Sequence, residues 1–128
     1  MKLNQVLMSC SLVIALLATA LAVLTEGKGP LGELAIGTVV VGVVATALNV
    51  LNLGKDLNKV VNVVRLVAGY AFVVVGVLGI VRNDSHPNEG DAKSNAVVGL
   101  GYVSYVLALV CGLGMVGDGM RSVVGVNV

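Results

Sequence analysis

The stretch ALNVLNLGKDLNKVVNVVRLVAG, residues 47–69, places four asparagines and four charged side chains between two long apolar runs. Gly54 is suited to the left-handed conformation that ends a helix, and Asp56 is suited to cap the helix that follows. The stretch therefore predicts a tight helical hairpin. Because its asparagines recur at spacings of three and four residues, a helix on either side of the turn carries polar groups on one face.

The composition of the whole chain places this hairpin in a membrane. Hydrophobic residues make up 57% of the 128 residues and charged residues 12%, and the mean hydropathy is +0.99. A soluble globular protein has about 45–50% apolar and about 25% charged residues. The chain is therefore expected to be a membrane protein, with the lipid bilayer as its surroundings.

Four apolar runs extend outward from the hairpin, each near the roughly 20 residues that cross about 30 Å of hydrocarbon. In lipid the backbone groups must be hydrogen-bonded within each segment, so each run is expected to be a helix despite its valines. The sequence predicts an all-α integral membrane protein, a single domain with four transmembrane helices in an up-down bundle. The predicted helices cover about 6–24, 31–53, 60–81 and 96–116, with an outer loop at 82–95.

The first run has a second interpretation. Lys2, the apolar run and the small-residue triplets Ala18-Thr19-Ala20 or Ala20-Leu21-Ala22 also fit a secretory signal peptide with its cleavage site. Cleavage of residues 1–22 would leave three helices. Both interpretations remain open at the level of sequence.

Lysines and arginines near the helix ends indicate the orientation. Cytoplasmic loops carry an excess of these residues, and the side that holds both termini holds more of them. Both termini are therefore predicted to be cytoplasmic. The inner side has Lys2, Lys55, Lys59, Arg65 and Arg121, and the outer side has Lys28, Arg82 and Lys93.

The polar side chains of the opening stretch have three interpretations. In the first they reach the headgroup region, with Arg65 extending there from about one and a half turns inside its helix. In the second the asparagines form hydrogen bonds between helices or subunits, each worth about 0.6 and at most about 2 kcal/mol. In the third they line an ion or substrate path. The residues of this candidate polar seam or vestibule are Asn49, Asn52, Asn62 and Arg65.

Small residues recur at spacings of three and four in the apolar runs. Helices in lipid associate by close packing, which small side chains permit. These stripes predict faces where the helices pack closely. The predicted packing residues are Ser11, Ala15, Ala18, Ala22, Gly69, Gly76, Gly101, Ser104, Ala108 and Gly112.

The two cysteines are expected at a similar depth. Cys10 and Cys111 each lie about one to one and a half turns from the cytoplasmic boundary, and they become neighbours if the first and last helices close the bundle. We interpret them as small buried apolar side chains and do not expect a disulfide between them.

Several function classes find no support in the sequence. One His and two distant Cys do not make a zinc site. A net charge of +1 does not indicate the strongly basic surface that binds nucleic acid. No nucleophile with its base, phosphate-binding loop or EF-hand spacing is present. We therefore expect no enzyme activity, no cofactor, no metal and no nucleic-acid partner.

Aromatic content is low for a protein that crosses the membrane four times, with no Trp, one Phe and three Tyr. Multi-pass proteins commonly anchor at the interfaces through Trp and Tyr. A structural role in a protein-dense assembly accounts for this, with the chain packed against copies or partners in a virion membrane, a pilus or a larger membrane complex. The alternative is a pore-forming or transport protein, such as a channel, a small transporter or a holin-like protein.

Overall fold

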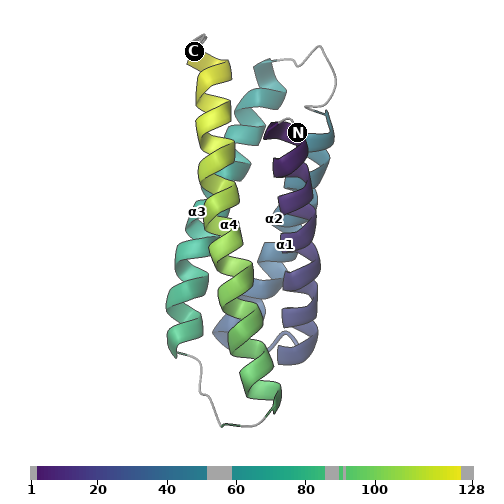
Figure 1. The fold of residues 1–128 in the computed structure, drawn as a ribbon, viewed down its shortest axis with the longest axis vertical. Helices are drawn as coiled ribbons and strands as arrows, with labels where there is room; N and C mark the ends of the chain where they lie inside the picture. Colours follow the sequence, from purple (N-terminus) through teal and green to yellow (C-terminus); the bar gives the residue numbers. More distant parts are fainter. Residues whose placement is uncertain (1–2, 52–58, 86–89, 91, 125–128) are drawn as a thin grey trace.

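The fold is a bundle of four helices (Figure 1). The computed structural model describes residues 3–51, 59–85, 90 and 92–124. The helices are α1 (Leu3–Thr25), α2 (Gly29–Leu51), α3 (Lys59–Ser85) and α4 (Ala92–Val124), and the described residues contain no strand. All four helices are long and apolar enough to cross a membrane. The predicted all-α membrane bundle is confirmed.

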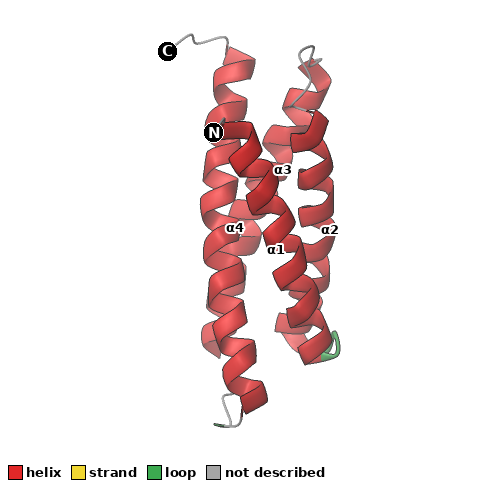
Figure 2. Ribbon diagram, turned by 45° about the vertical axis from the view of Figure 1, so that its right-hand side comes forward, coloured by secondary structure: helices red, strands yellow, loops and turns green. Residues whose placement is uncertain are grey.

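The helices run alternately up and down and form a ring in which α1 packs on α2, α2 on α3, α3 on α4 and α4 on α1 (Figures 1 and 2). α1 begins, α2 ends, α3 begins and α4 ends at the same end of the bundle, which we call the termini end. The turn between α1 and α2 lies at the other end, the turn end.

The turn from α1 to α2 is tight because the backbone enters the left-handed region. Glu26, Gly27 and Gly29 have φ angles of 57°, 67° and 76°. The Gly27 amide donates to the Ala22 carbonyl at 2.9 Å, which satisfies a carbonyl that the end of α1 leaves free. A Cβ on Gly32 would lie 2.7 Å from the Gly27 carbonyl carbon, so glycine there lets the turn fold against α2.

α3 and α4 are longer than the hydropathy pattern predicts. α3 continues to Ser85, and α4 begins at Ala92 and ends at Val124, so both extend into the segment 82–95 expected to be an outer loop. In this extension of α3, Asn83 Nδ2 donates to the Val98 carbonyl of α4 at 3.0 Å. The hydropathy pattern predicts where the membrane span ends, whereas the helix itself continues past that point.

The predicted packing residues lie between helices of the same chain. Ala22 is half-buried and the others are buried. A Cβ on Gly76 would lie 2.8 Å from the Leu109 amide nitrogen, and one on Gly112 would lie 2.7 Å from the Gly69 carbonyl oxygen. The backbones of α3 and α4 therefore approach closely, in a contact that larger residues would prevent.

Candidate functional site: a buried polar cluster

Each helix contributes one polar side chain to a cluster near the termini end: Ser11 from α1, Asn49 from α2, Arg65 from α3 and Asp118 from α4. Arg65 lies at its centre. Its Nε donates to Asn49 Oδ1 at 2.8 Å, and its Nη1 donates to Asp118 Oδ2 at 2.5 Å. We call these four residues the polar cluster.

Hydrogen bonds continue from Arg65 to α1. Asn49 Nδ2 donates to Ser11 Oγ at 3.2 Å, and Ser11 Oγ donates to the Leu7 carbonyl at 2.7 Å. The Asn49 side-chain oxygen therefore accepts a hydrogen bond from α3, and its side-chain nitrogen donates one to α1. This series of bonds joins all four helices, since Arg65 also bonds to α4.

The polar cluster is buried on all sides except at the carboxylate. Ser11, Asn49 and Arg65 have no exposed surface, whereas the Asp118 side chain is 24% exposed. Removing a guanidinium from water costs free energy. A carboxylate partner and further hydrogen bonds offset that cost only when their geometry is good. Two of the three guanidinium nitrogens of Arg65 have hydrogen-bond partners, so the cost is offset in part.

One nitrogen of Arg65 is not satisfied. Arg65 Nη2 is buried and has no hydrogen-bond partner among the described residues. A buried donor without an acceptor destabilises the fold by about 1–3 kcal/mol, and by more when it is charged. Arg65 Nη2 could therefore donate a hydrogen bond to a further acceptor, which the described part of the chain does not provide.

Beyond the polar cluster, toward the turn end, the core is mainly apolar, and its buried polar side chains among those described are Thr38, Ser104 and Asn83. Cys111 and Met115 border it, with Cys111 Sγ 3.6 Å from Ser11 Oγ and Met115 Sδ 3.7 Å from Asn49 Nδ2. Further along the bundle axis the buried side chains are mainly hydrophobic, and the larger ones are Ile14, Phe72, Leu21, Leu31 and Tyr105. The polar cluster is thus a layer across one end of the bundle rather than a polar path through it.

The structure brings only some of the residues predicted for a polar seam or vestibule into contact. Asn49 and Arg65 are in direct contact, whereas Asn52 lies outside the described residues and Asn62 lies in α3 with a side chain that is not described. Arg65 does not extend along the lipid-facing surface as the snorkelling interpretation expected, because its side chain is enclosed by the bundle.

Two members of the polar cluster were not predicted as such. Ser11 was expected only as a packing residue, and Asp118 was not assigned to the seam. The available signal is that Arg65 and Asp118 have opposite charges, with Arg65 near the start of the run 60–81 and Asp118 just after the run 96–116, on the same predicted side of the membrane. Acidic residues contribute little to the rule that predicts orientation, so that rule does not single out Asp118.

Polar contacts also form near the turn end. Arg82 Nη1 donates to the Pro30 carbonyl at 3.0 Å, and the Tyr102 hydroxyl donates to the Asp84 carboxylate. Glu26 and Lys28 form an exposed ion pair at 3.4 Å. Except for Tyr102, which lies about two turns inside the span of α4, these groups lie at or near the ends of the apolar spans, where polar contacts are expected at an interface.

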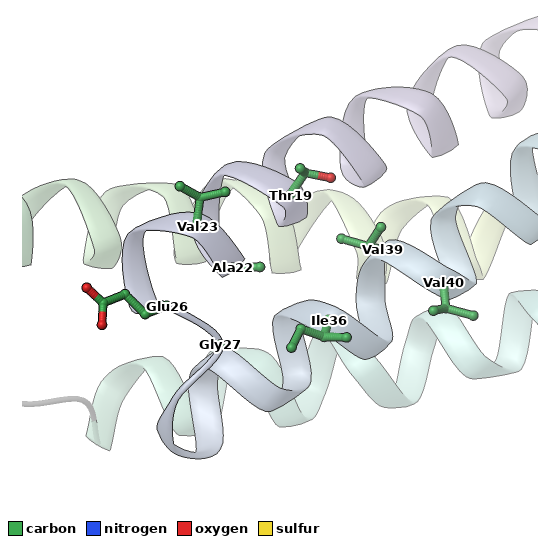
Figure 3. Close-up of a pocket in the computed structure, with 8 residues that line it drawn as sticks. All are labelled: Thr19, Ala22, Val23, Glu26, Gly27, Ile36, Val39 and Val40. Atoms are coloured by element: carbon green, nitrogen blue, oxygen red, sulfur yellow. The ribbon is translucent and has the colours of Figure 1, made fainter.

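A groove of about 400 Å³ lies between α1 and α2 near their turn (Figure 3). Its lining is mainly apolar and includes Val23, Ile36, Val39 and Val40, with Glu26 at one edge. Within the described ranges, no three His, Cys, Asp or Glu side chains come together in a way that could hold a metal ion. The polar cluster is therefore the strongest candidate for a functional site.

Comparisons with protein-family models, with curated proteins and with solved structures found no match.

Proposed function

We propose that the protein is a structural subunit of a protein-dense membrane assembly, in which it packs against copies of itself or against partner proteins. The observation that carries this proposal is the character of the lipid-facing surface. Most of its large exposed side chains are valines, and the only exposed aromatic residues among those described are Tyr70 and Tyr102. Valine has one preferred rotamer in a helix, so it loses little side-chain entropy when another helix packs on it.

One outward face of α4 is the best candidate for such a contact. Its residues recur at spacings of four and three, the repeat by which two helices pack along a seam. Gly99 and Gly117 have no atoms near the position of a Cβ, so both ends of the face permit close approach. We call this face the α4 seam, and it consists of Gly99, Val103, Val106, Val110, Leu113 and Gly117.

The native mass of the full-length protein in mild detergent and in nanodiscs tests the proposal. A homo-oligomer of 12.9 kDa chains is expected, or a complex with partner proteins on extraction from the native membrane. Val106→Trp in the α4 seam should dissociate the oligomer. Val74→Trp is the matched control, because Val74 on α3 is 55% exposed and Val106 is 47% exposed.

Two outcomes would contradict this proposal. A monomer under every mild condition, with no partner copurifying from the native membrane, would exclude an assembly role. Equal dissociation by Val106→Trp and Val74→Trp would exclude the α4 seam as the contact.

A second candidate function is transport or pore formation, including a holin-like role. The polar cluster favours it, because ionisable residues inside a membrane commonly mark ion or substrate paths. Arg65 Nη2 has no hydrogen-bond partner among the described residues. The apolar core toward the turn end makes it the second choice, since a path would need the helices to separate there.

Flux of ions or dyes in proteoliposomes tests the second candidate. Flux that disappears in Arg65→Leu and persists in the control Val64→Leu would support a path that uses the polar cluster. Val64 is the neighbouring residue and is 43% exposed. Flux that is unchanged in Arg65→Leu would remove Arg65 from any such mechanism, and no flux in the wild-type protein would remove the candidate.

A further inference from the structure

Two thiols meet where α1 packs on α4. Cys10 is half-buried and packs against the core cluster that contains Cys111, which is 1% exposed. Cys111 Sγ lies 3.6 Å from the Oγ of Ser11, the residue next to Cys10 in α1. Cys111 Sγ also lies 3.9 Å from the Leu7 carbonyl of α1. Both cysteines pack with the core cluster near the termini end, far apart in sequence and adjacent in space.

The two helices are held close at this point. A Cβ on Gly114, about one turn from Cys111, would lie 2.9 Å from Leu7 Cδ2, about one turn from Cys10. A disulfide requires Cα atoms within about 4.4–6.8 Å, which only closely packed helices provide. The absence of a large residue at position 114 therefore favours bond formation between the neighbouring thiols.

The sequence alone predicts no disulfide here, but the close packing of α1 on α4 beside both cysteines changes that expectation. We propose that Cys10 and Cys111 are a dithiol site that closes to an intramolecular disulfide by exchange with a lipid-soluble, apolar disulfide. The exposures of the two thiols assign their roles. Cys10 borders the lipid and is the attacking thiol, whereas Cys111 is enclosed and is the resolving thiol. An apolar reagent is required because both residues lie inside membrane spans, Gln5–Thr25 and Asn95–Met120.

The exchange proceeds in two balanced steps. The Cys10 sulfur loses its proton and attacks one sulfur of the reagent, so a mixed disulfide forms and one reagent thiol leaves. The Cys111 sulfur then loses its proton and displaces the second reagent thiol from Cys10. In total two S–H bonds and the reagent S–S bond are lost, and one protein S–S bond and two reagent thiols are formed.

Oxidation at this site acts on the polar cluster. Cys111 Sγ contacts Ser11 Oγ at 3.6 Å, and Ser11 Oγ accepts the bond from Asn49 that positions Asn49 toward Arg65. A disulfide would redirect the Cys111 sulfur toward Cys10 and fix α1 to α4. The dithiol site is thus placed where its redox state alters the bonds that join the four helices.

Reaction of the full-length protein in nanodiscs with 4,4′-dipyridyl disulfide tests the proposal, because each exchange releases one coloured pyridinethione. The wild-type protein should release two thiones per chain and lose two hydrogen atoms of mass, without a stable adduct. Cys111→Ser should release one thione and retain the adduct. Cys10→Ser should react at least ~10-fold more slowly, because Cys111 is enclosed.

A control variant distinguishes pairing of the two thiols from simple access of the reagent to one thiol. Val13→Cys in the Cys10→Ser protein places one thiol on α1 about one turn away, at a site that is 43% exposed, and should give one thione with a stable adduct. Stable adducts on both cysteines of the wild-type protein, disulfide-linked dimers, or no thione release would each overturn the proposal.

Discussion

The Arg65 guanidinium of α3 and the Asp118 carboxylate of α4 form an ion pair at 2.5 Å across the termini end of the bundle, with Arg65 fully enclosed. The pair places both charges inside a layer of hydrogen bonds to α1 and α2. In hydrocarbon an isolated charge is expensive, so each of the two residues depends on the other for its place in the fold.

Asp118→Asn should destabilise the fold by about 3–5 kcal/mol, because it leaves the Arg65 charge buried without its counter-charge. The double variant Arg65→Met with Asp118→Leu should be less destabilised than Asp118→Asn, because it removes both charges. The free energy of unfolding is measured from helix loss in mixed micelles with increasing SDS. Equal loss in the single and double variants would show that the ion pair is not coupled.

Asn49→Ala should destabilise by about 1–3 kcal/mol, because Arg65 Nε would lose its acceptor and remain buried. Val50→Ala is the control, since Val50 is the next residue and is 49% exposed. The same unfolding measurement applies, and a cycle with Ser11→Ala should give a coupling energy of about 0.5 kcal/mol or more. Additive effects of Asn49→Ala and Ser11→Ala would contradict the described bond between them.

Gly79→Ala should destabilise by about 1–3 kcal/mol, because a Cβ there would lie 2.1 Å from Cγ of the buried Tyr105 ring. Gly37→Ala is the matched control in α2, where a Cβ meets no atom within 4 Å. It should be neutral or stabilising, since alanine favours a helix by about 0.5–1 kcal/mol over glycine. Similar effects at both positions would mean that Tyr105 does not pack on α3 in this way.

Lys28 should react with a membrane-impermeant amine reagent from outside intact cells, because both termini are predicted to be cytoplasmic and the α1–α2 turn is then external. The Lys28 side chain is 81% exposed, so access within the protein does not limit labelling. Mass spectrometry of the labelled peptide gives the result, with Lys28→Ala as the control. Labelling only in inverted vesicles would reverse the predicted orientation.

The sequence was sufficient for the fold because lipid imposes one strong rule. Runs such as 6–24 and 31–53 are long, apolar and bounded by polar joints, and only helices satisfy their backbone groups in hydrocarbon. The bounds of α3 and α4 were less accessible, because residues such as Asn83 continue the helix through contacts with its neighbour. Hydropathy carries no information about such contacts.

The polar cluster was only partly accessible from sequence. Asn49 and Arg65 fall in one conspicuous stretch, so their grouping could be proposed from their spacing. Their partners Ser11 and Asp118 come from the first and last helices, and the contact depends on how the helices are rotated and shifted against each other. That register is set by close packing over many small residues, such as Gly112 against Gly69, and no single pattern encodes it.

The unequal lengths of the apolar spans affect the bilayer itself. Among the described residues, the span in α4 has 26 residues and those in α1, α2 and α3 have 21, 22 and 22, a difference of at least about 6 Å along the helix. A bilayer that matches the three shorter spans is too thin for α4, which must tilt or stretch the adjacent lipid. Two chains that meet along α4 share one deformed region instead of making two. If chains associate along α4 as proposed, bilayer thickness should control that association, and shorter-chain lipids should strengthen it.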